Sequence, residues 1–310
     1  MNLPKNTSVV ITNYNTRDIL KDCIINLLKL DEAKEILIID NASKDGSAQM
    51  VKAEFAHNPE IKLFALDRNT GLSHAGNIGL ENSNGKYLLY LGSDAFPKPG
   101  TIFGMQEYFE QSENAKVGAA TAKLVLRDGT LDMDAHRGFP TPFVALAHFS
   151  GLDKIFKRNK IFDKYFLGYE DLSKPHEIDL GISHFMMIRR DVFDLIGKWD
   201  EDYFVFGEDV DMCYRIKQGG WKIMYLPQFE AIHYKGASVG IRKESADISP
   251  ATAETKIRMM NMKAKGMETF YAKHYKKKYP WMLNAIVLTG IRGLNLMRMI
   301  KIKAKVFLKA

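Results

Sequence analysis

Four short apolar runs alternate with helical patterns in the first hundred residues, and this alternation constrains the fold more than any other feature. Strands joined through helices in this order form right-handed crossovers, which produce a parallel sheet with helices on both faces. The sequence therefore predicts an α/β fold with a mostly parallel central sheet. The predicted strands are residues 8–11, 36–39, 61–66 and 86–91, and the predicted helices between them are residues 17–30, 48–57 and 72–82.

Polar side chains follow each of these four apolar runs. The carboxyl ends of parallel strands meet at one edge of a sheet, where ligands bind, so four polar ends predict a binding crevice. A carboxylate such as Asp40 could accept hydrogen bonds from a ribose or a base edge, or it could cap the following helix together with Ser43. The polar ends are Thr12, Asn13, Tyr14 and Asn15 after the first run, Asp40 after the second, Asn69 and Gly71 after the third, and Ser93 and Asp94 after the fourth.

The composition is that of an ordinary globular protein. With 310 residues, 46% of them hydrophobic, the chain is long enough for one large α/β domain and an additional segment. Cys23 and Cys213 lie in predicted helices without the spacing of a metal site, which indicates reduced thiols in the core of a cytoplasmic protein. The polar residues 1–8 predict no signal peptide.

Positive charge is concentrated in the C-terminal region. The net charge is +7, yet residues 271–310 hold ten lysines and arginines and no acidic residue. The rest of the chain is slightly acidic, so the sequence gives little support to nucleic-acid binding. Within 281–310, the apolar residues Leu296, Ile300 and Phe307 share one helical face and basic residues share the other. This pattern is typical of a helix lying in an anionic membrane surface, although a solvated helix or an oligomerisation helix, as in a homodimer, would show it too.

The motifs at the strand ends resemble those of inverting glycosyltransferases of family 2. The similarity spans residues 7 to 275 and is nearest to rhamnosyltransferase-like members that build bacterial surface polysaccharides. It implies the GT-A fold, in which a Rossmann-like sheet binds a nucleotide sugar. The matching motifs are N-Y-N at 13–15, D-N-x-S-x-D-G-S at 40–47, R-N-x-G-x-x-x-A-x-N-x-G at 68–79, W-D-E-D-Y-F-x-F-G-E-D-V-D-M-C-x-R at 199–215 and H-Y-K-G-A-S at 233–238.

The resemblance implies a nucleotide site at the first three strand ends. Residues 12–15 and Asp40 would bind the base and ribose, and residues 69–71 and Asn77 would line the same pocket. Gly71 would allow close backbone approach at a helix start, where free N–H groups favour anions. An exposed or capping amide remains an equal alternative for Asn77.

The resemblance also implies a divalent metal, Mg²⁺ or Mn²⁺. Ser93-Asp94 occupies the place of the Asp-x-Asp motif found in many relatives, which leaves Asp94 as the charged ligand. A hard cation can complete its shell with water and phosphate oxygens, but Asp94 could also be a turn residue. His233 would be a ligand of the metal or of the diphosphate, and Lys235, Ser238 and Arg242 would meet phosphate from the same loop.

The segment 199–209 resembles the acceptor side of the family. The resemblance implies that Asp209 acts as the general base that takes the proton of the acceptor hydroxyl, with Glu208 as its orienting neighbour; Glu208 is the alternative base. Acidic residues at a helix start are also explained by the helix dipole, so at least one acid here serves only that purpose. Trp199, Tyr203 and Phe204 are expected at the acceptor site because of their position before the base.

These features predict three segments. Residues 1–245 form the catalytic domain, with a nucleotide-sugar half at 1–123 and an acceptor half at 124–245. Residues 246–280 close it with a helix, and residues 281–310 form the basic tail.

The expected activity is inverting transfer of a sugar from dTDP-rhamnose or a UDP-sugar to a hydroxyl of a glycan or polyprenyl-linked glycan. Its expected location is the inner face of the cell membrane. A catalytically inactive nucleotide-sugar-binding subunit is the alternative. A nucleotidyltransferase is less compatible, because residues 12–18 lack a glycine-rich basic loop.

Overall fold

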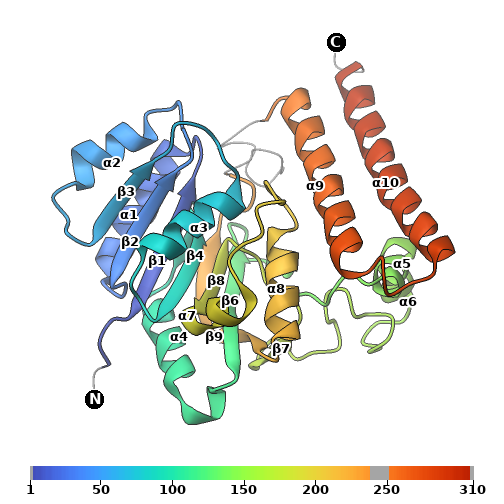
Figure 1. Cartoon of the computed structure of the whole chain (residues 1–310), viewed down its shortest axis with the longest axis horizontal. Helices are drawn as coiled ribbons and strands as arrows, with labels where there is room; N and C mark the ends of the chain where they lie inside the picture. The colour runs from blue at the N-terminus through green and yellow to red at the C-terminus, as the bar shows by residue number, and fades with distance from the viewer. Residues whose placement is uncertain (1–2, 238–250, 308–310) are drawn as a thin grey trace.

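The computed structural model describes residues 3–237 and 251–307. The chain has the predicted α/β architecture, with one central sheet, helices around it and a helical region at the C-terminal side (Figure 1). Nine strands form the sheet within the described residues, in the order β3-β2-β1-β4-β8-β6-β9-β5, and β7 pairs with β9.

The first half of the chain confirms the predicted strand–helix alternation. The strands β3, β2, β1 and β4 pair in parallel, so their carboxyl ends share one edge. All six residues of β2 and of β4 are buried, as the uninterrupted apolar runs predict. The elements are β1 (Thr7–Asn13), α1 (Arg17–Leu30), β2 (Glu35–Asp40), α2 (Ser47–Phe55), β3 (Ile61–Ala65), α3 (Leu72–Asn82) and β4 (Tyr87–Gly92).

The second half makes the sheet mixed, whereas the sequence predicted a mostly parallel one. β8 pairs antiparallel with β4, after a long segment that contains β6, α5, α6 and β7. β6 is antiparallel to β8 and parallel to β9. The elements are β5 (Ala95–Pro97), α4 (Thr101–Glu110), η1 (Ser112–Asn114), β6 (Val117–Leu126), η2 (Met133–Ala135), α5 (Pro142–Ser150), α6 (Leu152–Ile155), β7 (His176–Ile178), β8 (Phe185–Arg189), α7 (Arg190–Ile196), α8 (Glu208–Gln218) and β9 (Lys222–His233).

Two apolar clusters cover the two faces of the sheet. Side chains alternate along each strand, so Ile36 and Ile38 of β2 pack in one cluster while Leu37 and Ile39 pack in the other. Both cysteines are free and buried in these clusters, as predicted.

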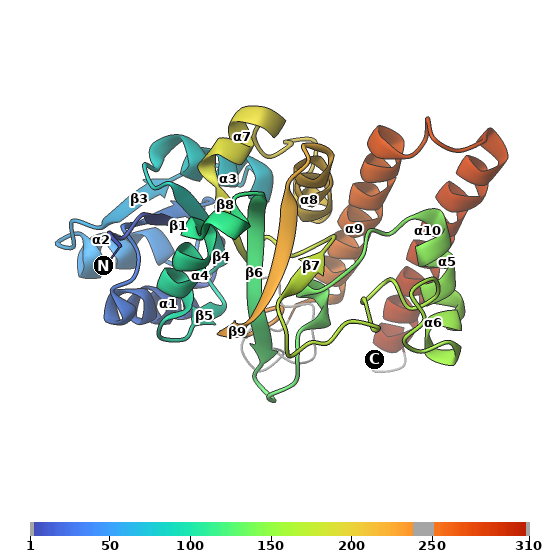
Figure 2. The same ribbon diagram turned by 90° about the horizontal axis from the view of Figure 1, so that it is seen from below.

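The helices α9 (Ala253–His274) and α10 (Trp281–Phe307) form an antiparallel hairpin beside the sheet (Figure 2). Tyr271 Oη donates a 2.7 Å hydrogen bond to Asn284 Oδ1, and Arg292 of α10 pairs with Glu268 of α9 at 2.7 Å. Lys273 pairs with Asp200 and Asp202, so some basic residues that lack acidic neighbours in sequence have them in space. Within the described ranges, none of the helices combines the length and apolarity needed to cross a bilayer.

Candidate active site

A buried hydrogen-bond network joins the carboxyl ends of β1, β2 and β4. Asn13 Nδ2 donates to Asp40 Oδ1 at 2.8 Å, and Thr16 Oγ1 donates to Asn13 Oδ1 at 2.5 Å. Thr16 Oγ1 also lies 2.8 Å from Ser93 Oγ. Three of the predicted strand-end residues, Asn13, Asp40 and Ser93, are thus joined with Thr16 in one connected, buried unit, and Asp94 adjoins it in sequence.

The loops after β1 and β2 hold each other in place. Asn15 Oδ1 accepts a 2.7 Å hydrogen bond from the Lys44 N–H, and the Asn15 N–H donates to Ser43 Oγ at 2.9 Å. Thr12 is partly buried, whereas Tyr14 is 42% exposed and its ring is accessible to a ligand. Helix α2 begins after Gly46 without a side-chain cap, which excludes the helix-capping interpretation of Asp40.

The turn after β3 packs against the segment that contains Phe204, a contact that the sequence did not predict. Gly71 has φ of +87°, and a Cβ there would lie 2.4 Å from the carbonyl oxygen of Phe204. The Leu72 N–H donates to that carbonyl at 2.7 Å, and the Gly71 N–H donates to Asn69 Oδ1 at 3.0 Å. The N–H groups of Gly71 and Leu72 are therefore partnered within the protein, and the glycine allows the Phe204 segment to approach.

Asn77 fastens α3 to the segment before the acidic motif. Its Oδ1 accepts from the Trp199 N–H at 2.9 Å, and its Nδ2 donates to the Trp199 carbonyl at 3.0 Å and to Glu201 at 2.8 Å. Trp199 and Tyr203 are buried in the core, so their rings are not accessible to an acceptor, in contrast to what their position suggested. Phe204 is 36% exposed and remains accessible.

Asp94 and His233 come together because β5 pairs with β9. His233 Nε2 lies 3.8 Å from Asp94 Oδ1, close enough for one cation with ligand distances of about 2.1 Å to contact both. Among the described residues, His233 Nε2 is buried without a hydrogen-bond partner, as a metal-binding nitrogen requires. A cluster of three or more His, Cys, Asp or Glu side chains that could hold a metal is not found in the described ranges. The two residues therefore fit a cation whose other ligands come from substrate and water.

Sequence reasoning missed Asp132, which holds the other nitrogen of His233. The His233 Nδ1–H donates to Asp132 Oδ2 at 2.8 Å, and Lys235 pairs with Asp132 as well. Burial alone would raise the pKa of Asp132, but the hydrogen bond from His233 and the charge of Lys235 lower it well below its usual range. The only sequence signal is an acid shortly after the apolar strand 117–126. Ser238 and Arg242, expected near phosphate, lie outside the described residues.

The acidic pair at the start of α8 has two different environments. Glu208 is buried and accepts a 3.0 Å hydrogen bond from Ser183 Oγ; burial and the neighbouring charge of Asp209 raise its pKa to about 8. Asp209 is 15% exposed, and its carboxylate lies 3.8 Å from the guanidinium of Arg137, a second residue that the sequence did not reveal. Burial and the neighbouring charge therefore favour the protonated form of Glu208, whereas Asp209 lies against a positive charge.

The residues just before β8 connect the acidic pair to Asp94 and His233. The His184 carbonyl accepts from the Gly92 N–H at 2.9 Å, and the His184 ring lies 5.7 Å from the ring of His233. Ser183, its neighbour, contacts Glu208. The strand-end network, the Asp94–His233 pair and the acidic pair thus lie at one continuous edge.

Helix α9 supports the turn that carries the acidic pair. Phe206 and Gly207 both have positive φ, +67° and +98°, and a Cβ on Gly266 of α9 would lie 2.0 Å from the Phe206 carbonyl oxygen. Positive φ is costly for a bulky residue such as phenylalanine, so the packing against α9 stabilises a strained turn.

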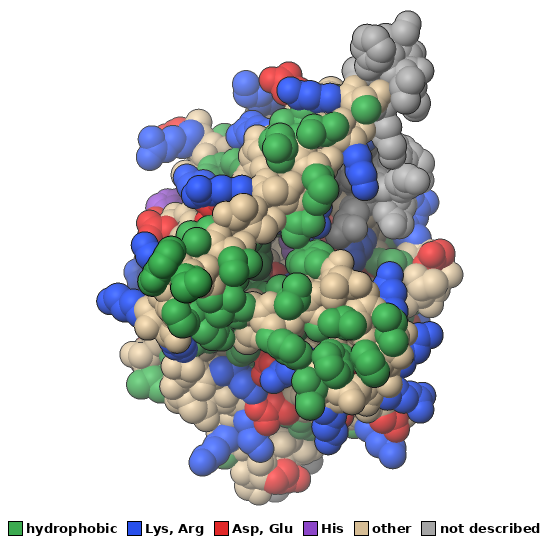
Figure 3. Space-filling view, turned by 90° about the vertical axis from the view of Figure 1, so that its right-hand side faces the viewer, with side chains coloured by type: hydrophobic (Ala, Val, Ile, Leu, Met, Phe, Trp, Pro, Cys, Tyr) green, Lys and Arg blue, Asp and Glu red, His purple; other side chains and the backbone are tan. Residues whose placement is uncertain are grey.

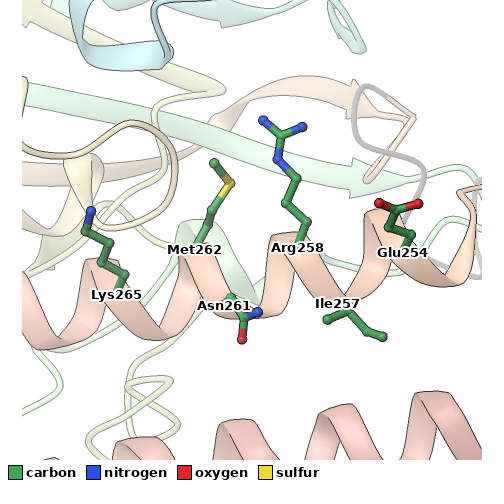
Figure 4. A pocket seen from close by; sticks show the side chains of 6 residues that line it. All are labelled: Glu254, Ile257, Arg258, Asn261, Met262 and Lys265. Atoms are coloured by element: carbon green, nitrogen blue, oxygen red, sulfur yellow. The ribbon is translucent and has the colours of Figure 1, made fainter.

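An open groove of about 460 Å³ runs along α9 (Figure 4). Arg258, Met262 and Lys265 point toward the sheet, while Ile257 and Asn261 point toward α10. Arg258 and Lys265 therefore face the sheet, and the opposite side of α9 faces α10.

Comparison with known proteins identifies the class. The sequence profile of the family described as "Glycosyl transferase family 2" matches residues 8–197, which is more than half of the chain. The chain belongs to glycosyl transferase family 2.

Two relatives carry rhamnosyltransferase names. The chain is 26% identical over 246 residues to an N-acetylglucosaminyl-diphospho-decaprenol L-rhamnosyltransferase of Mycobacterium tuberculosis, covering 75% of this chain and 77% of the relative. It is 25% identical over 236 residues to the rhamnosyltransferase WbbL of Escherichia coli, covering 73% and 82%.

Solved structures confirm the GT-A fold. A structure of GalNAc-T7 with UDP, GalNAc and Mn²⁺ aligns with a TM-score of 0.57 at 18% identity over 86% of this chain, which spans about half (49%) of that longer chain. The mannosyltransferase PcManGT from Pyrobaculum calidifontis, solved with GDP-Man and Mn²⁺, aligns with a TM-score of 0.56 at 15% identity over 96% of this chain and 73% of its own.

Proposed function

We propose that this protein transfers a sugar, with inversion of the anomeric centre, from a nucleoside diphosphate donor to a hydroxyl of a glycan or polyprenyl-linked glycan. The donor would be dTDP-rhamnose or a UDP-sugar, and the product would enter a bacterial surface polysaccharide. The observation that carries the proposal is the convergence of the strand-end network, the Asp94–His233 pair and the acidic pair at one sheet edge. Family membership and the rhamnosyltransferase names of two relatives support the reaction class.

The nucleotide would bind over the ends of β1, β2 and β4. In this proposal Asp40 accepts from the base or ribose, and the exposed ring of Tyr14 packs on the base. Thr12, Asn13, Asn15 and Ser93 shape the pocket around them. Because Asp40 is already positioned by Asn13 and by the Ser43 N–H at 3.1 Å, the donor would meet a rigid carboxylate.

A Mg²⁺ or Mn²⁺ ion would be held by Asp94 and His233 at the diphosphate end of the donor. When bound, such an ion stabilises the negative charge of the departing nucleoside diphosphate. Asp132 keeps the proton of His233 on Nδ1, which leaves Nε2 as the nitrogen that faces Asp94.

Asp209 would take the proton of the acceptor hydroxyl. Glu208 is the weaker candidate for the base, because burial and the charge of Asp209 raise its pKa to about 8 and favour its protonated form. The acceptor oxygen would attack the anomeric carbon from the side opposite the nucleotide, which inverts the configuration in one displacement. Phe204 is the aromatic residue of its segment that could contact the acceptor.

A thermal-shift panel of nucleotide sugars tests the donor proposal directly. We expect one nucleoside diphosphate class to raise the melting temperature in the presence of Mn²⁺, because a ligand that binds only the folded state stabilises it. The Asp94→Ala variant should lose the metal-dependent part of this shift. If the parent protein responds equally with and without Mn²⁺, the metal-assisted donor site is wrong.

A further inference from the structure

One face of the molecule displays most of the large apolar side chains that are exposed. Sixteen such side chains are exposed in the described residues, and twelve of them lie in only two segments, 143–161 and 281–300. The first segment belongs to the aromatic insert, which we define as residues 139–169, and the second is α10. Figure 3 shows hydrophobic side chains gathered over this face, with Lys and Arg side chains between and around them. The most exposed are Leu146, Ile155 and Ile161 of the insert and Trp281, Met282 and Ile286 of α10.

The two segments are more than a hundred residues apart in sequence but lie side by side in space. Both ribbon views show α5 and α6 next to α10 (Figures 1 and 2). The insert is internally fixed. The ring of His148 stacks on Tyr165 with centroids 4.0 Å apart, and its Nδ1 lies 2.6 Å from Asp153. The exposed apolar side chains therefore stand on a folded support.

The charges on this face favour a lipid surface over a second protein. Lys157, Lys160, Arg298 and Lys301 are exposed among the apolar side chains, and α10 contains no acidic residue. Apolar side chains edged by lysine and arginine are typical of surfaces that bind anionic lipid headgroups. Protein interfaces, by contrast, are depleted of lysine.

We propose that the aromatic insert and α10 together form one docking surface for an anionic lipid bilayer. In this proposal the aromatic insert contacts lipid as well as packing within the protein, and membrane binding depends on the insert and α10 together. The relevance of this surface to catalysis rests on the proposed function. The insert is connected to the proposed base through two neighbouring residues: Arg137 lies 3.8 Å from Asp209, and the N–H of Gly138 donates to the Tyr165 carbonyl of the insert at 3.1 Å. Docking would bring the proposed base near a lipid-linked acceptor.

Co-sedimentation with vesicles tests the surface without any transfer assay. Full-length protein is mixed with phosphatidylcholine vesicles that contain either no phosphatidylglycerol or about 30% of it. Each mixture is prepared at low salt and at physiological salt. The insert variant carries Leu146→Ser and Ile155→Ser, and the α10 variant carries Ile286→Ser and Ile300→Ser. The matched control, Ile25→Ser with Leu195→Ser, removes two exposed apolar side chains from α1 and α7, which lie away from this face. A charge variant, Lys157→Glu with Lys160→Glu, tests the insert without changing an apolar residue.

We expect the parent and the control to bind anionic vesicles and to release them as salt rises. The insert and α10 variants should each bind about tenfold or more weakly, since each loses part of the apolar anchoring. The charge variant should lose mainly the anionic preference. If the insert variant and the charge variant bind vesicles as the parent does, membrane binding depends on α10 alone, and the proposal of one surface formed by the insert and α10 is wrong. Absence of parental binding, or a parental dimer in ultracentrifugation that the same substitutions dissociate, would also overturn it. A vesicle result of either kind leaves the donor test above unaffected.

Discussion

At the residue scale, the hydrogen bond between Asp132 and His233 determines which nitrogen of His233 can accept a metal ion. The carboxylate holds Nδ1–H at 2.8 Å and leaves Nε2 facing Asp94. Removing a carboxylate that orients a metal-binding histidine typically costs about 10–100-fold in metal affinity.

We therefore expect Asp132→Asn to weaken Mn²⁺ binding by about tenfold or more, measured by calorimetry with UDP or dTDP present. The matched control is Asp128→Asn in the same loop, because Asp128 is exposed and, among the described residues, accepts its side-chain hydrogen bonds from Thr130 of its own turn. Equal Mn²⁺ affinity in both variants and the parent would show that Asp132 does not position a metal-binding histidine.

Glu208 gives a pH-dependent prediction. Its pKa rises from 4.5 to about 8 on folding, first through burial and second through the charge of Asp209. The folded state then binds the proton of Glu208 more tightly than the unfolded state does. The contribution of the protonated carboxyl to the free energy of unfolding is complete below about pH 4.5 and is lost as the pH rises through 8.

Glu208→Gln keeps the shape and cannot ionise, so it should be more stable than the parent at pH 8 by about 1–3 kcal/mol, and close to the parent at pH 5. Urea unfolding at both pH values measures the difference. If the difference in free energy of unfolding between the parent and Glu208→Gln is the same at both pH values, the raised pKa of Glu208 is contradicted.

At the element scale, α9 holds the turn that carries the acidic pair. Alanine normally stabilises a helix relative to glycine by about 1 kcal/mol. At position 266 the added Cβ would lie 2.0 Å from the Phe206 carbonyl oxygen, so the substitution must displace either the helix or the turn.

We expect Gly266→Ala to destabilise the protein by about 1–3 kcal/mol and to reduce transfer. Gly290→Ala and Gly293→Ala on α10, where an added Cβ meets nothing within 4 Å, should stabilise it by up to about 1 kcal/mol. Urea unfolding of all three variants checks the contrast. Similar stability changes at the three positions would mean that α9 does not support the turn.

The elements that local sequence patterns specify were predictable. Helices α1 and α3 occupy the expected residues, because each shows a clear helical period between polar ends. β7 and the entry of β8 were not predictable, since β7 has only three residues and the segment before it lacks periodicity. The mixed sheet depends on long-range pairing, which leaves no mark in the local sequence.

At the scale of the whole molecule, motifs indicated which residues lie at the functional edge but not how each is used. That Asp40 and Asp94 lie at one edge could be predicted from parallel strand ends, whereas the position of His233 was expected only from the family resemblance. The roles of Gly71 and Trp199 could not be predicted, because they depend on how the 199–204 segment packs on α3. Asp132 and Arg137 belong to no motif, and only the folded chain brings them to His233 and Asp209.

The central claim is that Asp209 is the base of a glycosyl transfer reaction at this edge. The most direct measurement is the rate of sugar transfer from dTDP-rhamnose and UDP-sugars to a polyprenyl diphosphate-linked N-acetylglucosamine acceptor, for the parent and for Asp209→Asn. An amide keeps the shape but cannot take a proton, so we expect a loss of about 10²–10⁴-fold, with the thermal shift by the donor nucleotide retained. Transfer by Asp209→Asn within a few-fold of the parent, or no transfer by the parent from any of these donors, would contradict the account.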